Sequence, residues 1–270
     1  GGTLEGEFDN LRSAIGWLAR CEPQLGLHLI AYASEFWCNH SLYSEAREQL
    51  EEALVRISPE DSYPYALALG RLGQIAWMQG DHAVAQIHLE KSIRLWRTLQ
   101  NTYELGIFLQ FLALALYNHN EYETALIPAQ EAVALLRTQS ALHWLAIALN
   151  ALGIIHSALG DYEKARIVQE ECLALFRQAG HSWGIGLALS GLVDIPYAAG
   201  DFVTARTYLQ EALDIYRTLG DRWFTSQELW YLGKVIWQQG DRHQAIIYWE
   251  ESVALGREVG AKDFVSGSLL

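Results

Sequence analysis

The residues from Leu152 to Leu173 read LGIIHSALGDYEKARIVQEECL, and this stretch decides the fold. At its centre stands the pair Gly160-Asp161, followed after three more residues by Ala165. Apolar residues recur every three or four positions on both sides of the pair, which is the period of an amphipathic helix. Glycine ends a helix cheaply because it accepts positive φ, and aspartate caps the helix that follows. The stretch therefore predicts two helices joined by a tight turn.

The same pattern returns along the chain every 40 residues, as in the steps from Gly160 to Gly200 and Gly240. Asn120-Glu121 fills one slot where the glycine is missing. Small residues recur at two positions of the second helix. The first set is Ala46, Ala85, Ala125, Ala165, Ala205 and Ala245, and the second is Ala53, Ser92, Ala132, Cys172, Ala212 and Ser252. Small residues let helices approach closely, and one pair cannot bury its own apolar face, so the pairs must stack.

These repeats predict an all-α solenoid of antiparallel helix pairs, forming one continuous domain over residues 1–270. The expected pairs cover about 24–57, 62–99, 102–139, 142–179, 182–219 and 222–259. Residues 3–20 are expected to be a lone helix, the second of a preceding pair, and residues 262–270 the start of a further helix. Both ends are therefore expected to continue in the natural chain.

The spacing L-G-x6-G-D-x3-A resembles the tetratricopeptide repeat over nearly the whole chain. The period departs from the usual length of about 34 residues, although versions with longer helices occur in bacterial regulators and in polarity or motor adaptors. The resemblance implies a right-handed superhelix whose concave face is lined by the first helices of the pairs. It also implies that this concave groove binds a partner and carries out no chemistry.

Residues 5–18 read EGEFDNLRSAIGWL. They resemble the E-x-x-N-L-R-x-A-x-x-W segment that opens the repeat region of bacterial STAND-type signalling ATPases. In that family the repeats are the sensor, and a nucleotide-binding module lies upstream. No G-x4-G-K-[ST] phosphate loop occurs in these 270 residues, so any such module would precede them.

Side chains on one stripe of each first helix are the candidate partner-binding residues. They are Tyr63, Trp77, Tyr103, Tyr117, His143, Asn150, Trp183, Asp194, Tyr197, Trp223, Trp230, Lys234 and Trp237. Aromatic platforms with scattered polar groups are typical of a surface that anchors a peptide, a helix or a small ligand. Alternatively, these rings pack between adjacent first helices as core. For the last three residues we favour binding, because two indoles would surround one cation.

Two further features have a structural and a functional interpretation. Arginines recur near the ends of the second helices, at Arg97, Arg137, Arg177, Arg217 and Arg257. We favour attraction of these cations to the helix C-termini over a basic stripe for an acidic partner. Pro128 and Pro196 should kink their helices. The kink at Pro196 would shape the binding stripe; alternatively, the prolines are neutral substitutions in a tolerant repeat.

Composition narrows the function further. The net charge of −13 disfavours direct binding to nucleic acid or to anionic membranes. The longest apolar stretch, Leu105 to Tyr117, is too short to span a bilayer, and three cysteines without metal-ligand spacing favour a reducing, cytoplasmic location. No nucleophile elbow, metal-binding motif or dinucleotide fingerprint occurs. We therefore expect no enzyme activity, no metal and no cofactor.

The expected function is that of a sensor domain in a larger bacterial STAND-type ATPase. The expected partner is a protein or peptide, with a small-molecule inducer as a second class. The alternative is a constitutive scaffold that holds a linear peptide or helix. The N-L-R-x-A segment favours the sensor, whereas a native chain without an upstream ATPase would favour the scaffold.

Overall fold

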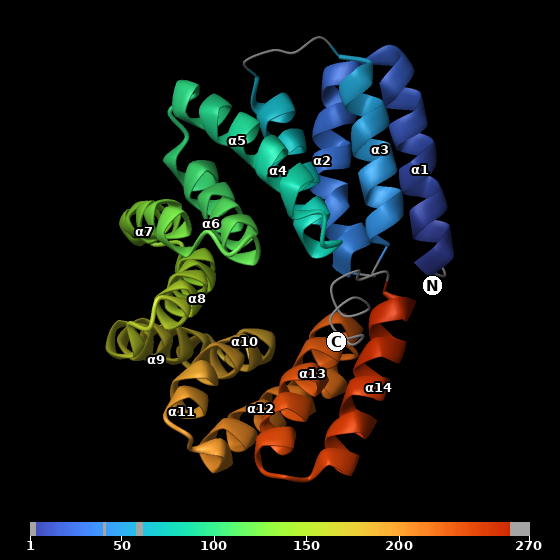
Figure 1. Ribbon diagram of the computed structural model, residues 1–270. Coiled ribbons are helices and arrows are strands. Elements are labelled where there is room, and N and C mark those ends of the chain that lie inside the picture. The colour runs from blue at the N-terminus through green and yellow to red at the C-terminus, as the bar shows by residue number, and fades with distance from the viewer. Residues whose placement is uncertain (1–3, 40–41, 58–61, 260–270) are drawn as a thin grey trace. The chain divides into compact units, whose positions relative to one another are not determined.

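The computed structural model describes residues 4–39, 42–57 and 62–259, and over these ranges it contains helices and turns but no strand. The expected helix at 262–270 lies outside these ranges. The helices (Figure 1) are α1 (Leu4–Cys21), α2 (Pro23–Asn39), α3 (Tyr43–Val55), α4 (Tyr63–Met78), α5 (His82–Thr98), α6 (Thr102–Asn118), α7 (Tyr122–Thr138), α8 (Leu142–Ala158), α9 (Tyr162–Ala179), α10 (Ser182–Leu192), α11 (Asp194–Ala198), α12 (Phe202–Leu219), α13 (Arg222–Gln238) and α14 (Arg242–Glu258). The all-α repeat architecture predicted from the sequence is confirmed.

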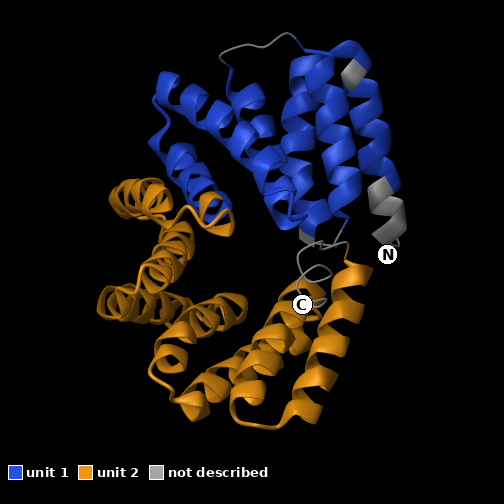
Figure 2. Ribbon diagram, viewed as in Figure 1, with its two compact units in different colours: residues 1–115 blue, residues 116–270 orange. Residues whose placement is uncertain are grey.

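The chain divides into two compact units, Gly1–Ala115 and Leu116–Leu270 (Figure 2). In the first unit, α2 packs against α1, α3 and α4, and α4 packs against α5. In the second, α8 packs against α7 and α9, α10 against α9 and α12, and α13 against α12 and α14. These contacts join helices that are neighbours in the chain or one helix apart, as a stack of pairs requires. The single continuous domain stays a prediction.

A residue in the left-handed region recurs every 20 positions, between all successive helices from α4 to α14 except α10 and α11. The positions are Gly80, Gln100, Asn120, Ser140, Gly160, Gly180, Gly200, Gly220 and Gly240, with φ between 53° and 92°. The positive φ expected at the Gly-Asp turns is confirmed. The turns that connect one pair to the next have the same conformation as those within a pair, which the 40-residue sequence pattern did not indicate.

The aspartates after the turn glycines have two different roles. Asp201 and Asp241 cap the next helix, each accepting a hydrogen bond at 3.1 Å from the backbone N–H three residues later. Asp81 and Asp161 do not cap, so the prediction is wrong at these positions. At each of these positions the carboxylate accepts a hydrogen bond from a charged side chain instead, because charge-assisted hydrogen bonds are stronger than neutral ones. The donors are Arg47 at 2.7 Å and Lys164 at 2.9 Å.

Small residues lie where the helices of a pair approach most closely. All six alanines of the first predicted set are fully buried. A β-carbon added at Gly153 of α8 would overlap the side chain of Gln169 of α9, and one added at Gly233 of α13 would overlap Trp249 of α14. These glycines therefore fix the approach of first and second helices at the same place in two copies.

The two prolines inside predicted helices differ in their effect. The first helix of the fifth pair is interrupted at Val193, which separates α10 from α11, and Pro196 lies three residues further on. Proline cannot donate a backbone hydrogen bond and its ring crowds the carbonyl four residues earlier, here that of Leu192. In contrast, α7 continues without interruption through Pro128.

Candidate functional site

In the first unit, Tyr63 belongs to a polar network between first helices. Its hydroxyl donates to Glu104 Oε1 at 2.8 Å and lies 3.0 Å from the hydroxyl of Tyr32. Its ring packs edge-on against Trp96, with the centroids 5.0 Å apart. The other two candidates here lie apart from this network: Trp77 packs near Phe111 at 5.8 Å, and Tyr103 is 37% exposed.

Two buried charged residues accompany this network. Arg71 is 7% exposed and pairs with Glu35 at 3.0 Å and with Gln74 at 2.9 Å. Burial raises the pKa of Glu104, and the hydrogen bond from Tyr63 and the charge of Arg71 oppose that rise. Sequence reasoning missed Arg71, although a cation in the otherwise apolar α4 was a visible signal. These polar contacts connect α2, α4 and α6.

In the second unit, the rings at the starts of the first helices lie beside other rings. His143 lies 6.0 Å from Phe176 of the same pair and 5.0 Å from His181 at the start of the next, measured between ring centroids, and it is exposed. Trp183 packs edge-on against Phe224 of the next pair at 5.2 Å. Trp223 contacts the same phenylalanine, its direct neighbour in α13, at 4.6 Å. The contact between pairs favours the packing interpretation for Trp183.

Three rings surround the ammonium group of Lys234. Its Nζ lies 4.8 Å from the ring centroid of Trp230, 5.5 Å from that of Tyr231 and 5.6 Å from that of Tyr197. Lys234, Trp230 and Tyr231 are on α13, and Tyr197 is on α11. Within residues 4–39, 42–57 and 62–259, Lys234 makes no hydrogen bond or ion pair. Its ammonium group therefore lies against ring faces and has no direct carboxylate partner in this part of the chain.

Asp194 and Tyr117 lie in the electrostatic environment of this cluster. Burial raises the pKa of Asp194, and the positive charge of Lys234 opposes that rise. Burial and the charge of Asp194 raise the pKa of Tyr117 to about 12. The structure thus brings together five polar or aromatic candidates from the sequence, Tyr117, Asp194, Tyr197, Trp230 and Lys234, and adds Tyr231, which lies one position off the predicted stripe.

Trp237 has a different cation from Trp230. It is 38% exposed, and the guanidinium carbon of Arg242 lies 5.0 Å from its ring centroid. Its ring also packs near Trp249 of α14 at 5.5 Å. The expected pair of indoles around Lys234 is therefore not found, because Trp237 turns toward the second helix of its own pair.

Two polar residues of the first helices are buried instead of displayed. Asn150 is 8% exposed, and its backbone carbonyl accepts a hydrogen bond at 3.1 Å from Gln169. Glu228 of α13 is fully buried, with Ser190 of α10 at 2.6 Å from its Oε1. Sequence reasoning missed Glu228, because nothing in the sequence distinguishes it from the many solvated glutamates of the chain.

The recurring arginines connect successive second helices. Arg137 of α7 pairs with Glu171 of α9 at 2.7 Å, and Arg217 of α12 pairs with Glu251 of α14 at the same distance. These two arginines thus have partners within the chain, which supports a structural role. Their acidic partners come from the Glu-Glu slot that recurs along the second helices.

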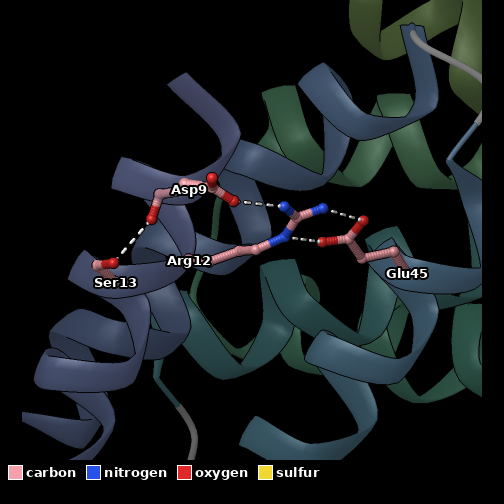
Figure 3. Close-up of polar contacts among 4 residues, drawn as sticks. All are labelled: Asp9, Arg12, Ser13 and Glu45. Carbon is pink, nitrogen blue, oxygen red and sulfur yellow. Dashed lines mark hydrogen bonds and ion pairs between the residues drawn. The ribbon is translucent and has the colours of Figure 1, made fainter. Parts of the chain in front are cut away.

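A related contact fixes α1, and Figure 3 shows it. The guanidinium of Arg12 donates to both carboxylate oxygens of Glu45 on α3, at 2.6 and 2.9 Å, and to Asp9 at 2.9 Å. Arg12 is the arginine of the N-L-R segment quoted above. A bidentate geometry gives this pair both strength and a defined orientation, so this arginine positions the lone helix on the first complete pair.

Two kinds of feature are absent from the described residues. No group of three or more histidine, cysteine, aspartate or glutamate side chains in this part of the chain is arranged to hold a metal ion. No helix within it is long and apolar enough to cross a membrane.

Comparison with known proteins gives one sequence match and several structural ones. Residues 144–218 match the family model of the tetratricopeptide repeat. No curated protein matches the chain. Among solved structures, the fold is similar to aspartyl phosphate phosphatase F from Bacillus subtilis, with a TM-score of 0.73 and 14% identity over 94% of this chain and 66% of that one.

Two further structures share the fold. One is a Rap protein in complex with competence and sporulation factor, with a TM-score of 0.72 and 14% identity over 84% of this chain and 63% of that one. The other is a signal transduction ATPase with numerous domains, carrying a tetratricopeptide repeat sensor, from Pyrococcus horikoshii; its TM-score is 0.59 and its identity 14%, over 91% of this chain and 43% of that one. The chain thus spans less than two thirds of the length of both proteins.

Proposed function

Because this chain is a tetratricopeptide repeat protein, we propose that it is the non-catalytic sensor region of a larger STAND-type signalling ATPase. Its partner, a protein or peptide segment, binds the first-helix face of the second unit, around Tyr197, Trp230 and Lys234. The observation that carries this proposal is the unpaired ammonium of Lys234, held among three aromatic rings.

The comparison between repeat copies supports a binding role for Lys234. The equivalent residues in the earlier copies, at steps of 40, are Gln74, Leu114, Ile154 and Asp194. Two of these four are aliphatic, so the packing of the repeat does not require a charged side chain at this position. A cation there costs desolvation and gains no ion pair within the described chain. Such local departures from the packing rule are typical of functional positions.

Two observations support the sensor assignment. The N-L-R segment lies in α1, and its arginine joins this helix to the first pair through Glu45. A repeat sensor attached to a signalling ATPase has the same fold as this chain. In such a protein, a ligand that prefers one state of the array would shift the whole molecule toward that state.

Peptide display on the immobilised chain tests the binding proposal. Peptides selected by the wild type should lose binding to a Trp230→Ala/Trp237→Ala variant whose helical circular dichroism is unchanged. Trp17→Ala is the matched control, because Trp17 of α1 is 55% exposed and lies in the other unit. Equal binding by the double variant would place recognition elsewhere. The selected peptide, added to the full-length protein, should then change its rate of ATP hydrolysis; a full-length chain without a nucleotide-binding module would instead be a scaffold.

A further inference from the structure

Asp194 and Lys234 are opposite charges at the same repeat position of successive first helices. They are close enough for the lysine to lower the pKa of the aspartate, against the rise that burial causes. They nevertheless form no ion pair, so their charged atoms are more than 4.0 Å apart. Opposite charges that are partly buried together without contact leave part of their desolvation uncompensated. This arrangement calls for a group between them.

Two phenol hydroxyls belong to the same environment. Burial raises the pKa of Tyr117 and of Tyr231, and the negative charge of Asp194 adds to the rise in both. Neither hydroxyl makes a hydrogen bond to any other residue that the structure describes. Four polar groups at one place therefore have no partner among the described residues, and their polar atoms remain open to solvent, so that a ligand can reach them.

The aromatic rings favour a cation in this environment. The faces of Tyr197, Trp230 and Tyr231 surround the Lys234 ammonium at 4.8 to 5.6 Å. Ring faces attract cations electrostatically, and Asp194 adds a full negative charge. A bound anion would contact Lys234, and a bound cation would contact Asp194 and the rings. The set of groups is thus complementary to both signs of charge at once.

We propose that Asp194 and Lys234 together bind a free zwitterionic small molecule of the α-amino acid type. Its ammonium would contact Asp194 and the ring faces, its carboxylate would contact Lys234, and the hydroxyls of Tyr117 and Tyr231 would complete the hydrogen bonding. A ligand of one charge would leave Asp194 or Lys234 uncompensated, and a neutral amide would offset neither. The inference rests on the part of the proposed function that makes this first-helix face the sensor site, and it assigns a small-molecule inducer to that site.

The test begins with thermal shifts of the wild-type chain in the presence of each of the twenty standard amino acids at millimolar concentration. The best stabiliser is then compared by calorimetry with its own decarboxylated amine and its deaminated acid. We expect the amino acid to bind at least about tenfold more tightly than either analogue. Equal affinity of a singly charged analogue, or no stabilisation by any amino acid, would overturn the proposal.

Variants assign the two charges separately. Asp194→Asn and Lys234→Gln should each weaken binding of the amino acid by at least about tenfold. In addition, the Asp194→Asn variant should bind the deaminated acid and the amino acid with equal affinity. The Lys234→Gln variant should bind the decarboxylated amine and the amino acid with equal affinity. Tyr162→Ala is the control, because Tyr162 is an exposed residue of the second helix α9, and it should bind like the wild type. Wild-type affinity in either charge variant would contradict the assignment.

The result is separable from that of the peptide selection. Peptides that depend on Trp230 and Trp237, with no amino acid bound, would refute the zwitterion site and leave the proposed function standing. Binding of an amino acid through Asp194 and Lys234, with no selected peptide, would refute the protein or peptide partner alone.

Discussion

Glu228 illustrates at the scale of one residue how burial determines a protonation state. The Ser190 hydroxyl donates to Glu228 Oε1 at 2.6 Å and also lies 2.9 Å from the carbonyl of Gly186. The hydrogen bond from Ser190 favours the ionised carboxylate and lowers its pKa. Burial outweighs this hydrogen bond and raises the pKa of Glu228 to about 8. The titratable groups facing it, Tyr216 of α12 and Tyr231 of α13, carry no positive charge to lower it.

This proton makes the stability of the chain depend on pH. The carboxyl titrates near pH 4.5 in the unfolded chain and near 8 in the folded one. Between these values the folded chain holds a proton that the unfolded chain has released, so stability falls by about 1.4 kcal/mol per pH unit as pH rises, and it levels off above pH 8. Urea unfolding of Glu228→Gln should lack this slope, relative to the wild type, between pH 5 and about 8. If the Glu228→Gln variant showed the same slope as the wild type, Glu228 would not be the source of the pH dependence. The control is Glu211→Gln, at an exposed position, which should keep the slope.

The left-handed turn residues allow a second prediction at this scale. Gly160 has φ +78° and open space around its α-carbon, so Gly160→Val should destabilise through the backbone alone, by about 1–2 kcal/mol. Ser140 has φ 53°, and Ser140→Gly should stabilise by about 0.5–1 kcal/mol. The control is Gly16→Ala, in a helix with open space, which should stabilise slightly. Melting temperatures that do not follow these opposite signs would contradict the turn assignment.

At the scale of the element, Pro196 separates α10 from α11 and places Asp194 and Tyr197 on a short helix of their own. Pro196→Ala restores a backbone donor, and we expect α10 and α11 to join into one helix. Hydrogen exchange of the amides from Val193 to Ala198 should then slow by about tenfold or more, since opening would cost at least another 1.4 kcal/mol. Unchanged exchange would mean that packing, and not the proline, breaks the helix. Pro128→Ala is the matched control, because α7 is already continuous.

The whole molecule shows which features a sequence can predict. Helix pairs and turns followed from Gly160, Ala165 and their equivalents, because local backbone and packing rules act alike in every copy. The side-chain contacts of the candidate site could not be predicted from the repeat pattern. The repeat pattern places Lys234 on a first helix, but its contacts with Tyr231 and Tyr197 depend on rotamers and on the break before α11. Glu228 was missed because burial of one glutamate depends on tertiary packing, which no local pattern records.

Stacking of neighbours also predicts that part of the array folds alone. Residues 142–259 comprise three pairs in the second unit, with contacts between α8 and α9, α10 and α12, and α13 and α14. About three repeats suffice for a stable solenoid. We expect this fragment to be helical by circular dichroism and to melt cooperatively. A fragment without a melting transition would show that three pairs are too few here.

The left-handed residues that return every 20 positions from Gly160 to Gly240 have a consequence for the gene. The backbone leaves Gly160 and Gly200 in the same conformation. A gene recombined so that the codons up to Gly160 are followed by those after Gly200 therefore encodes a native turn at the junction. Unequal crossing-over between these points would add or delete one complete copy without a faulty junction. Paralogues of this chain should therefore differ in length by whole steps of 40 residues, the interval from Gly160 to Gly200.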